Sequence, residues 1–304
     1  MNPPPGVTRD APLTRLNTVR TGGAADFLAR PASNKQVVEL LAWAEGEGLP
    51  VGVIGSGSNL LIADSGFRGL VIKLDGHLTE LHFTDDGVLA GGGARLPRLA
   101  SRAAEQGLAG LEFGVNIPGT VGGAIRMNAN AYGGELASVL EWAELATPAG
   151  VERRGADGFE FRYRGSNVTG YQVVTRAQFR LKPADPDAVK SLLGELRDRR
   201  KQAQPSGIKT FGSTFKNPDD PRAGGRTAGQ LLESAGCKGL EHGGARFSPK
   251  HANFVENFAG ASTADVVALI AEGRKRVAER FDGLSLETEV QVLGEVDAEL
   301  WGGA

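Results

Sequence analysis

A short stretch of the chain, Gly212–Pro218 with the sequence GSTFKNP, combines residue types that could bind and protonate an anionic substrate. Ser213 carries a hydroxyl, and Lys216 and Asn217 follow with an ammonium and an amide. Serine is also common in turns, where its hydroxyl bonds to the backbone, and by itself the stretch predicts such a turn. Two glycine-rich segments upstream indicate, in addition, a bound cofactor that carries phosphate.

The first glycine-rich segment, Gly55–Leu61, follows a predicted strand, where phosphate-binding loops are usually found. It is not a dinucleotide-binding fingerprint, because Leu60 stands in place of the third glycine, and it is not a P-loop, because no Gly-Lys-Ser/Thr closes it. Its amides and hydroxyls could still form an anion-binding nest; a glycine-rich hairpin is the alternative. The candidate cofactor-binding residues are Gly55, Ser56, Gly57, Ser58 and Asn59.

The second glycine-rich segment, Ile117–Ala124, joins a proline–glycine turn signal to a pair of glycines. Gly122 and Gly123 have no side chains, so a flat ring or a diphosphate can come close to the backbone there. A turn without a ligand is the alternative. The candidate cofactor-binding residues are Pro118, Gly119, Thr120, Gly122, Gly123 and Ala124.

Composition narrows the class of protein. The 304 residues leave room for two or three domains, and 40% hydrophobic residues are enough for a buried core. A formal charge of −2 without a basic run argues against nucleic-acid binding, and a single cysteine, Cys237, excludes an internal disulfide. Because neither a signal peptide nor a membrane-spanning run is found, we expect a soluble, cytoplasmic protein without a membrane partner.

The apolar patterns predict the elements that position these segments. A helix is expected over Asn34–Gly46, with strands over Val51–Ile54 and Gly69–Leu74, which we interpret as a β-α-β unit with the first glycine segment after its second strand. Short β-like runs follow up to residue 182, interrupted by a helix near Pro97–Gln106. These β-like runs, expected to form strands, are Val88–Ala90, Trp142–Thr147 and Gln172–Leu181.

The proline-rich stretch Lys182–Pro186 marks the clearest boundary. Beyond it the pattern predicts helices over 187–202, 227–235 and 262–281 and a terminal strand over 286–293, which is an α/β arrangement. The longest of these helices begins with a capping-box spacing, Ser262 and Asp265. We therefore expect three domains, at 1–75, 76–184 and 185–304.

Six motifs occur in one order along the chain. They are GSGSNLL, GFRGLVI at 66–72, GLEFGVNIPGTVGGAIRMNANAYG at 110–133, FRYRGS at 161–166, GSTFKNP, and GGARFSPKHANFVEN at 243–257. In this order they resemble the UDP-N-acetylenolpyruvoylglucosamine reductase (MurB) family over nearly the whole chain, in its shorter type without an extra tyrosine segment. The resemblance implies an α+β fold: a two-part FAD-binding module of the vanillyl-alcohol-oxidase (PCMH) type, then an α/β substrate-binding domain.

The resemblance also implies a reaction. NADPH would reduce noncovalently bound FAD, which would reduce the enolpyruvyl ether of UDP-N-acetylglucosamine-enolpyruvate to the lactyl ether of UDP-N-acetylmuramate, in peptidoglycan precursor synthesis. Arg164 matches the family's arginine beside the substrate carboxylate, Ser213 its proton donor, and Glu289 its carboxylate. Arg162 and Glu287 are nearby alternatives, each expected on the same strand face as the residue it could replace.

By charge and by hydrogen bonds, Lys216 and Asn217 are expected to hold the substrate diphosphate. We expect a structural role for His251 and no metal, since no second histidine or cysteine lies at metal-ligand spacing. The chain departs from the usual family pattern at Gly165, at Arg126 and over 205–210. A flavin-dependent oxidase of an alcohol or sugar, and a noncatalytic nucleotide-sugar binding protein, are the alternative functions.

Overall fold

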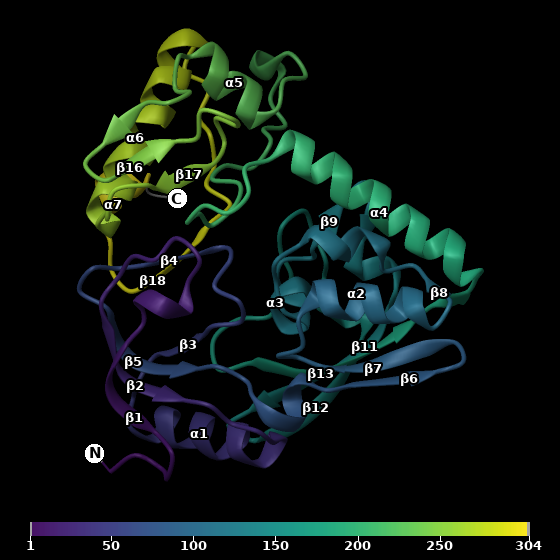
Figure 1. The fold of residues 1–304 in the computed structure, drawn as a ribbon. Coiled ribbons are helices and arrows are strands. Elements are labelled where there is room, and N and C mark those ends of the chain that lie inside the picture. The colour runs from purple at the N-terminus through teal and green to yellow at the C-terminus, as the bar shows by residue number, and fades with distance from the viewer. Residues whose placement is uncertain (1, 303–304) are drawn as a thin grey trace. The chain divides into compact units, whose positions relative to one another are not determined.

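The computed structural model describes residues 2–302 and divides into two compact units (Figure 1). Unit 1 contains the chain up to Ala11, Asp26–Ser56 and Arg68–Arg200. Unit 2 contains Pro12–Ala25, Gly57–Phe67 and the chain from Lys201 onward. Two stretches of the predicted first domain thus pack with the C-terminal third of the chain, while the three-domain division stays a prediction.

Unit 1 holds most of a four-stranded sheet, ordered β1-β2-β5-β3, in which β3 and β5 run parallel. Its strands are β1 (Thr8–Pro12), β2 (Ala24–Ala29), β3 (Val51–Val53) and β5 (Phe67–Ile72). Helix α1 (Asn34–Gly46) has the predicted bounds, is capped by the Ser33 hydroxyl, and buries Val37, Leu40, Leu41 and Ala44. The predicted helix and strands around the first glycine segment are therefore confirmed.

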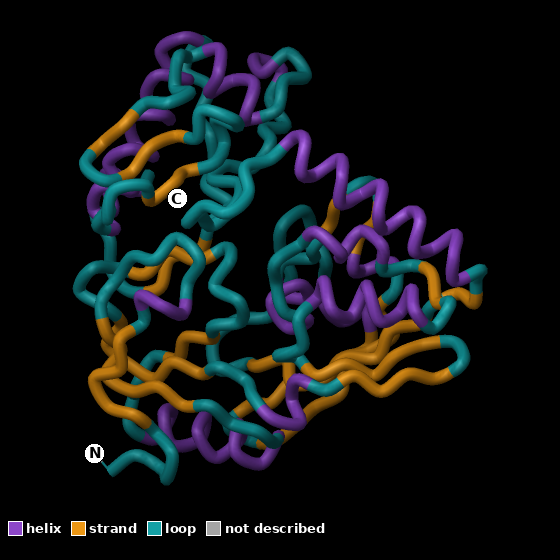
Figure 2. Tube along the Cα trace, viewed as in Figure 1, coloured by secondary structure: helices purple, strands orange, loops and turns teal. Residues whose placement is uncertain are grey.

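A five-stranded antiparallel sheet forms the rest of unit 1, in the order β12-β11-β13-β7-β6. Its strands are β6 (Leu81–Thr84), β7 (Gly87–Gly91), β11 (Leu140–Thr147), β12 (Gly150–Gly155) and β13 (Val173–Arg180). Helices α2 (Leu96–Glu105) and α3 (Val121–Arg126) lie on one side of this sheet and α1 on the other (Figure 1). Figure 2 shows the strands of both sheets in orange.

Smaller elements complete unit 1. They are β8 (Leu108–Ala109), β9 (Asn130–Ala131), β10 (Gly134–Glu135), β14 (Lys182–Pro183) and α4 (Pro186–Ala203), whose last turn enters unit 2. The main core of this unit packs α2 and α3 against the five-stranded sheet around Phe113, Phe159 and Phe179.

Unit 2 packs three helices with two small sheets. The helices are α5 (Ala228–Ser234), α6 (Thr263–Arg280) and α7 (Ala298–Trp301). One sheet contains β15 (Glu241–His242), β16 (Ala245–Phe247) and β17 (Val255–Asn257), and in the other β4 (Leu60–Ile62) runs parallel to β18 (Gln291–Leu293). The capping box predicted at the start of α6 is present, with both of its hydrogen bonds.

The predicted terminal strand is too long. Only Gln291–Leu293 form a strand, and before it Thr288 makes an isolated bridge to Phe215. The alternating residues between Leu286 and Val290 are extended, but they pair with irregular segments and so form no continuous ladder.

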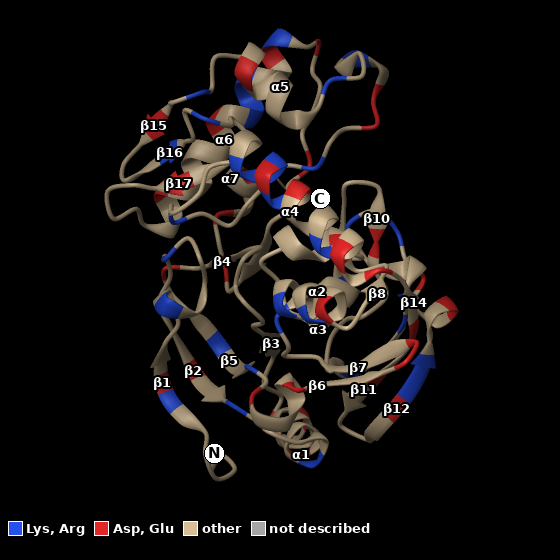
Figure 3. Ribbon diagram, turned by 45° about the vertical axis from the view of Figure 1, so that its right-hand side comes forward, with Lys and Arg blue, Asp and Glu red and all other residues tan. Residues whose placement is uncertain are grey.

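Charge and hydropathy are distributed without a dominant region. Lys and Arg are interspersed with Asp and Glu on both units (Figure 3), in line with a formal net charge of −2. No helix among residues 2–302 is long and apolar enough to cross a membrane.

Candidate active site

The first glycine segment begins where β3 ends beside β5. The Ile54 amide donates to the Ile72 carbonyl at 2.9 Å, and the next residue, Gly55, lies against Thr120. A Cβ on Gly55 would lie 2.3 Å from Thr120 Oγ1, far inside van der Waals contact. Glycine at this position therefore allows the two glycine segments of unit 1 to touch.

The same segment continues into unit 2 at Gly57. This residue has φ +65°, and its carbonyl accepts from the Thr18 amide at 3.0 Å. The Asn59 side chain donates to the Glu289 carbonyl at 3.2 Å, and the Asn59 carbonyl accepts from the Gln291 amide at 3.1 Å. The predicted five-residue loop is thus anchored in both units, at Gly55 in one and at Asn59 in the other.

The second glycine segment is fastened to a run of three glycines that the sequence reasoning missed. The Val121 amide donates to Ala94 at 2.9 Å and the Gly122 amide to Gly92 at 2.8 Å. A Cβ on Gly92 would lie 1.9 Å from the Val174 carbonyl oxygen, so no other residue fits there. The signal was present as Gly91-Gly92-Gly93 at the end of an apolar run.

Arg164 lies at the tip of a tight turn in unit 1, not on a strand. Arg162 and Gly165 exchange both backbone hydrogen bonds, at 3.0 and 3.1 Å, and Arg164 between them has φ +57°. The expectation that Arg162 and Arg164 share a strand face is wrong, because the chain reverses within these four residues. Arg162 is exposed whereas Arg164 is half-buried.

Contacts within unit 1 direct the Arg164 side chain. Its Nη1 donates to Asn130 Oδ1 at 2.9 Å, and its guanidinium carbon lies 5.1 Å from the centre of the Tyr163 ring. A bond to a side-chain amide restricts the rotamers of the guanidinium, whose planar fork is the shape that suits a carboxylate.

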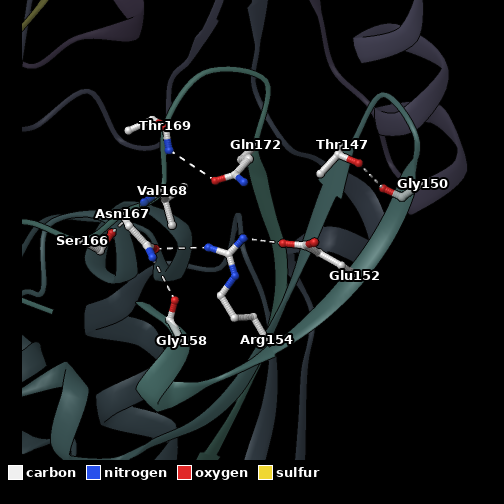
Figure 4. A network of polar contacts seen from close by, with 10 residues as sticks. All are labelled: Thr147, Gly150, Glu152, Arg154, Gly158, Ser166, Asn167, Val168, Thr169 and Gln172. Carbon is white, nitrogen blue, oxygen red and sulfur yellow. Dashed lines mark hydrogen bonds and ion pairs between the residues drawn. The ribbon is translucent and has the colours of Figure 1, made fainter. Parts of the chain in front are cut away.

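The segment that follows Arg164 is tied to the five-stranded sheet (Figure 4). Arg154 donates to Asn167 Oδ1 at 3.1 Å, and Asn167 donates to the Gly158 carbonyl at 2.9 Å. The Ser166 hydroxyl donates to the Arg126 carbonyl at 3.0 Å. The turn that presents Arg164 is therefore attached both to β12 and to the end of α3.

Ser213 and Glu289 lie on neighbouring extended segments of unit 2. Ser213 forms an isolated bridge with Phe254, and the Thr214 amide donates to the Asn253 carbonyl at 2.7 Å. On its other side Thr214 accepts from the Glu289 amide at 2.8 Å. The structure thus brings the backbones of the predicted proton donor and carboxylate together, whereas Arg164 belongs to unit 1 and its proximity to them stays a prediction.

Asn253 fixes the Ser213 segment, and the sequence reasoning did not single it out. Its side chain accepts from the Phe215 amide and donates to the Phe215 carbonyl, both at 2.9 Å. Its neighbour His251 accepts from the Asn253 amide at 3.2 Å and packs on Phe254, with 4.9 Å between ring centres. Burial lowers the pKa of His251, which suits a neutral, structural ring, as the sequence reasoning favoured.

Lys216 and Asn217 each have a protein partner. Lys216 forms an ion pair with Glu287, the carboxylate named as the alternative to Glu289. The side-chain oxygen of Asn217, Oδ1, accepts from the Ala228 amide at 3.0 Å, at the start of α5. The side-chain amide hydrogens of Asn217 and the charge of Lys216 remain the groups that could bind a diphosphate.

Two family descriptions match the chain in succession. Residues 25–155 match an FAD binding domain, and residues 204–293 match the C-terminal domain of UDP-N-acetylenolpyruvoylglucosamine reductase. The first match covers α1, both glycine segments and most of the five-stranded sheet, and the second covers the Ser213 segment and Glu289. The predicted fold class, an FAD-binding module followed by a substrate-binding domain, is confirmed.

The residues around Gly55 fit a cofactor such as FAD. Ser56 Oγ is buried and has no hydrogen-bond partner within residues 2–302, as expected of a hydroxyl that serves a ligand. Gly55 and the paired glycines after Thr120 supply backbone without side chains beside it. The donors here are neutral amides and hydroxyls, and the ammonium of Lys73 lies next to the Gly55 carbonyl. Such a set of donors suits a diphosphate.

Relatives of known name cover almost the whole chain. The UDP-N-acetylenolpyruvoylglucosamine reductase of Anaeromyxobacter dehalogenans (strain 2CP-C) is 44% identical over 287 residues, which are 94% of this chain and 85% of that protein. The enzyme of the same name from Geobacillus kaustophilus is 40% identical over 95% of this chain and 93% of its own length. The crystal structure of UDP-N-acetylenolpyruvylglucosamine reductase (MurB) from Thermus caldophilus superimposes with a TM-score of 0.81, at 33% identity, over 95% of this chain and 99% of that one. This chain therefore belongs to the UDP-N-acetylenolpyruvoylglucosamine reductase (MurB) family.

Proposed function

We propose that this protein reduces the enolpyruvyl ether of UDP-N-acetylglucosamine-enolpyruvate to the lactyl ether of UDP-N-acetylmuramate. Family membership implies FAD as the cofactor and NADPH as the reductant. The observation that supports the proposal most is the agreement with a relative of this activity over 94% of the chain, across the cofactor and the substrate parts alike. The reaction supplies a precursor of peptidoglycan.

The two glycine segments would hold FAD, which would supply the chemistry for adding a hydride from NADPH to the terminal carbon of the substrate alkene. This addition places negative charge on the substrate as an enolate next to its carboxylate. A protein can lower the barrier by holding a cation where that charge develops. The remaining tasks of the chain are to bind the diphosphate, hold the carboxylate, and deliver one proton to carbon.

Arg164 is the group we assign to the carboxylate. Its planar fork matches two carboxylate oxygens. The bond from Nη1 to Asn130 Oδ1 orients the guanidinium within unit 1. Presentation on a tight turn tied to β12 and α3 restricts its position, which favours the developing charge over the substrate ground state.

Ser213 is the group we assign to proton delivery. Its segment is held by Phe254 and Asn253 on one side and by Glu289 on the other. A hydroxyl is a weak acid, so Ser213 needs polarising neighbours while it gives its proton to the substrate carbon, and a source such as water that returns the proton afterwards. Glu289, on the adjoining segment, is the carboxylate that we place beside the substrate carboxyl group with Arg164.

The proposed partners are small molecules, namely the UDP-linked enolpyruvyl sugar and NADPH. We infer no nucleic-acid or membrane partner, in keeping with the interspersed surface charges (Figure 3). Because NADPH and nucleotide-linked sugars are cytoplasmic metabolites, we place the reaction in the cytoplasm. FAD would be bound noncovalently.

A steady-state assay tests this function against the oxidase alternative. The FAD-loaded protein is given NADPH in air, with and without the enolpyruvyl substrate, while NADPH, dissolved oxygen and product mass are followed. We expect NADPH consumption to depend on the substrate and to match a product heavier by two hydrogens, with little oxygen consumed. Oxygen consumption driven by an alcohol or sugar, without conversion of the enolpyruvyl substrate, would favour an oxidase instead.

A further inference from the structure

We propose that Lys73, assisted by Arg95, binds the diphosphate of FAD beside Gly55 and Ser56. The proposal rests on the proposed function, because it presupposes FAD binding in unit 1. It assigns a charged contact to a site whose candidate residues, taken from the glycine segments, are all uncharged.

Lys73 is placed over the first glycine segment by the sheet. It follows β5 directly, and its amide donates to the Ala29 carbonyl of β2 at 3.0 Å. Its Nζ donates to the Gly55 carbonyl, so the ammonium lies next to the backbone that turns toward Ser56. An ammonium has three N–H donors, and within residues 2–302 this bond uses one of them.

Three further groups of unit 1 converge on the same place. Thr120 touches Gly55, and its backbone forms a bridge with Arg95, which brings that arginine to the loop. Ser56 Oγ is the buried hydroxyl without a partner. The Lys73 ammonium, the Thr120 hydroxyl and Ser56 therefore lie next to Gly55, and the backbone of Arg95 lies alongside Thr120. Cations and hydroxyls of this kind are the donors that a diphosphate requires.

The charges here are not balanced by the protein. Burial lowers the pKa of Lys73, and Arg30 and Arg95 lower it further, while Asp75 opposes this. The Asp75 carboxylate itself accepts from the Gly76 amide, and none of the three cations has an ion pair in the described part of the chain. An anion bound at this place would relieve the repulsion between the cations, so the cluster favours a ligand with negative charge.

A purely structural role is the competing explanation. Lys73 could serve only to hold the Gly55 carbonyl, and its loss would then loosen the loop for every ligand alike. Glutamine separates the two roles, because it can still donate to a carbonyl but carries no charge. The adenine–diphosphate half and the ring half of the cofactor can also be tested apart, with ADP and riboflavin.

The experiment measures dissociation constants of the apoprotein for FAD, ADP and riboflavin at low and high salt, by flavin fluorescence and by calorimetry. We expect Lys73→Gln to weaken FAD and ADP by roughly 10- to 100-fold, the effect of losing a charge-assisted hydrogen bond, and to leave riboflavin nearly unchanged. Lys73→Arg should recover part of the loss. The matched control is Lys35→Gln on α1, an exposed lysine 3.9 Å from Glu39, which should change nothing.

Each outcome decides a separate point. Equal weakening of riboflavin and FAD by Lys73→Gln, or no weakening of ADP, would overturn the diphosphate assignment. A salt dependence of FAD binding as steep in Lys73→Gln as in the wild type would overturn it as well. A wild-type protein that binds neither FAD nor riboflavin would instead refute the proposed function.

Discussion

Ser213 occupies a segment whose backbone is held from both sides, so its side chain can be changed without loss of the segment. The bonds that hold it run from Thr214 to Asn253 and from Glu289 to Thr214, and none uses the Ser213 hydroxyl. We expect Ser213→Ala to leave reduction of the flavin by NADPH nearly intact. Reoxidation by the substrate should slow by roughly 10²- to 10⁴-fold, the usual contribution of a positioned acid.

Stopped-flow spectroscopy of the two half-reactions measures this, with Ser234→Ala on α5 as the control. Equal slowing of both half-reactions would show that Ser213 supports the cofactor or the loop. An unchanged second half-reaction would make it a turn residue only, with the proton coming from water or Glu289.

Arg164 and Arg162 give a matched pair of substitutions. Arg164 is half-buried and bonded to Asn130, whereas Arg162 is exposed at the base of the same turn. Lysine keeps the charge of arginine but loses its planar fork. We expect Arg164→Lys to slow substrate reduction at least tenfold with FAD still bound, and Arg162→Lys to have little effect. Kinetics that are impaired in Arg162→Lys and normal in Arg164→Lys would reverse the assignment.

At the scale of single residues, the sequence located candidates better than it described their surroundings. Ser213, Arg164 and Glu289 could be named because six motifs occur in one order, and those assignments remain predictions. The pairing of Lys216 with Glu287 joins positions far apart in the chain, which no local pattern can indicate. The turn at Arg164 was missed because a left-handed φ at an arginine leaves no trace in residue type.

At the scale of the elements, the contact between the two glycine segments of unit 1 is sensitive to any added side chain. Alanine at Gly55 would place Cβ 2.3 Å from Thr120 Oγ1, and overpacking of this kind costs about 1–3 kcal/mol. We expect Gly55→Ala to weaken FAD binding at least tenfold and to lower the thermal unfolding temperature of the holoprotein. The control is Gly155→Ala on the end of β12, where a Cβ meets nothing within 4 Å.

Flavin fluorescence titration and a thermal melt read out both effects. Gly55→Ala with wild-type FAD affinity would show that the two glycine segments do not form the cofactor site.

The elements themselves were predicted where one helix face or one buried strand produces a clear period. Helix α1 and the start of α6 agree with their patterns because apolar spacing and capping residues coincide there. A strand was expected over 286–293, but only β18 forms one. A ladder requires pairing partners as well as an alternating sequence. The glycine run 91–93 was overlooked because these glycines are needed where the chain passes close to the backbone of Leu78 and Val174, and the sequence does not show which segments will lie there.

At the scale of the whole molecule, unit 2 is built from three separate stretches of the chain. Val19 and Leu61 lie in the same core as α5 and α6, and β4 pairs with β18. The Asn257 side chain also donates to the Val19 carbonyl at 2.9 Å. Composition could not reveal this arrangement, because it predicts only a boundary near residue 184 and carries no sign of the long-range packing of 12–25 and 57–67.

This architecture predicts that residues 201–304 do not fold alone. Loss of Val19 and Leu61 would open cavities at about 2–5 kcal/mol each, against a typical domain stability of about 5–15 kcal/mol. We expect the isolated fragment to lack a cooperative unfolding transition in circular dichroism and calorimetry. A fragment that melts cooperatively would support instead an independent domain over 185–304.

The central claim is that electrons from NADPH pass through this protein to the enolpyruvyl substrate. The most direct measurement is a single turnover without oxygen: the FAD-loaded protein is reduced with NADPH, the UDP-linked enolpyruvyl sugar is added, and flavin absorbance is followed. We predict that the absorbance returns on addition of the substrate and that a product with two more hydrogens forms in equal amount. Absorbance that stays bleached with the substrate and returns only when air is admitted would contradict the account.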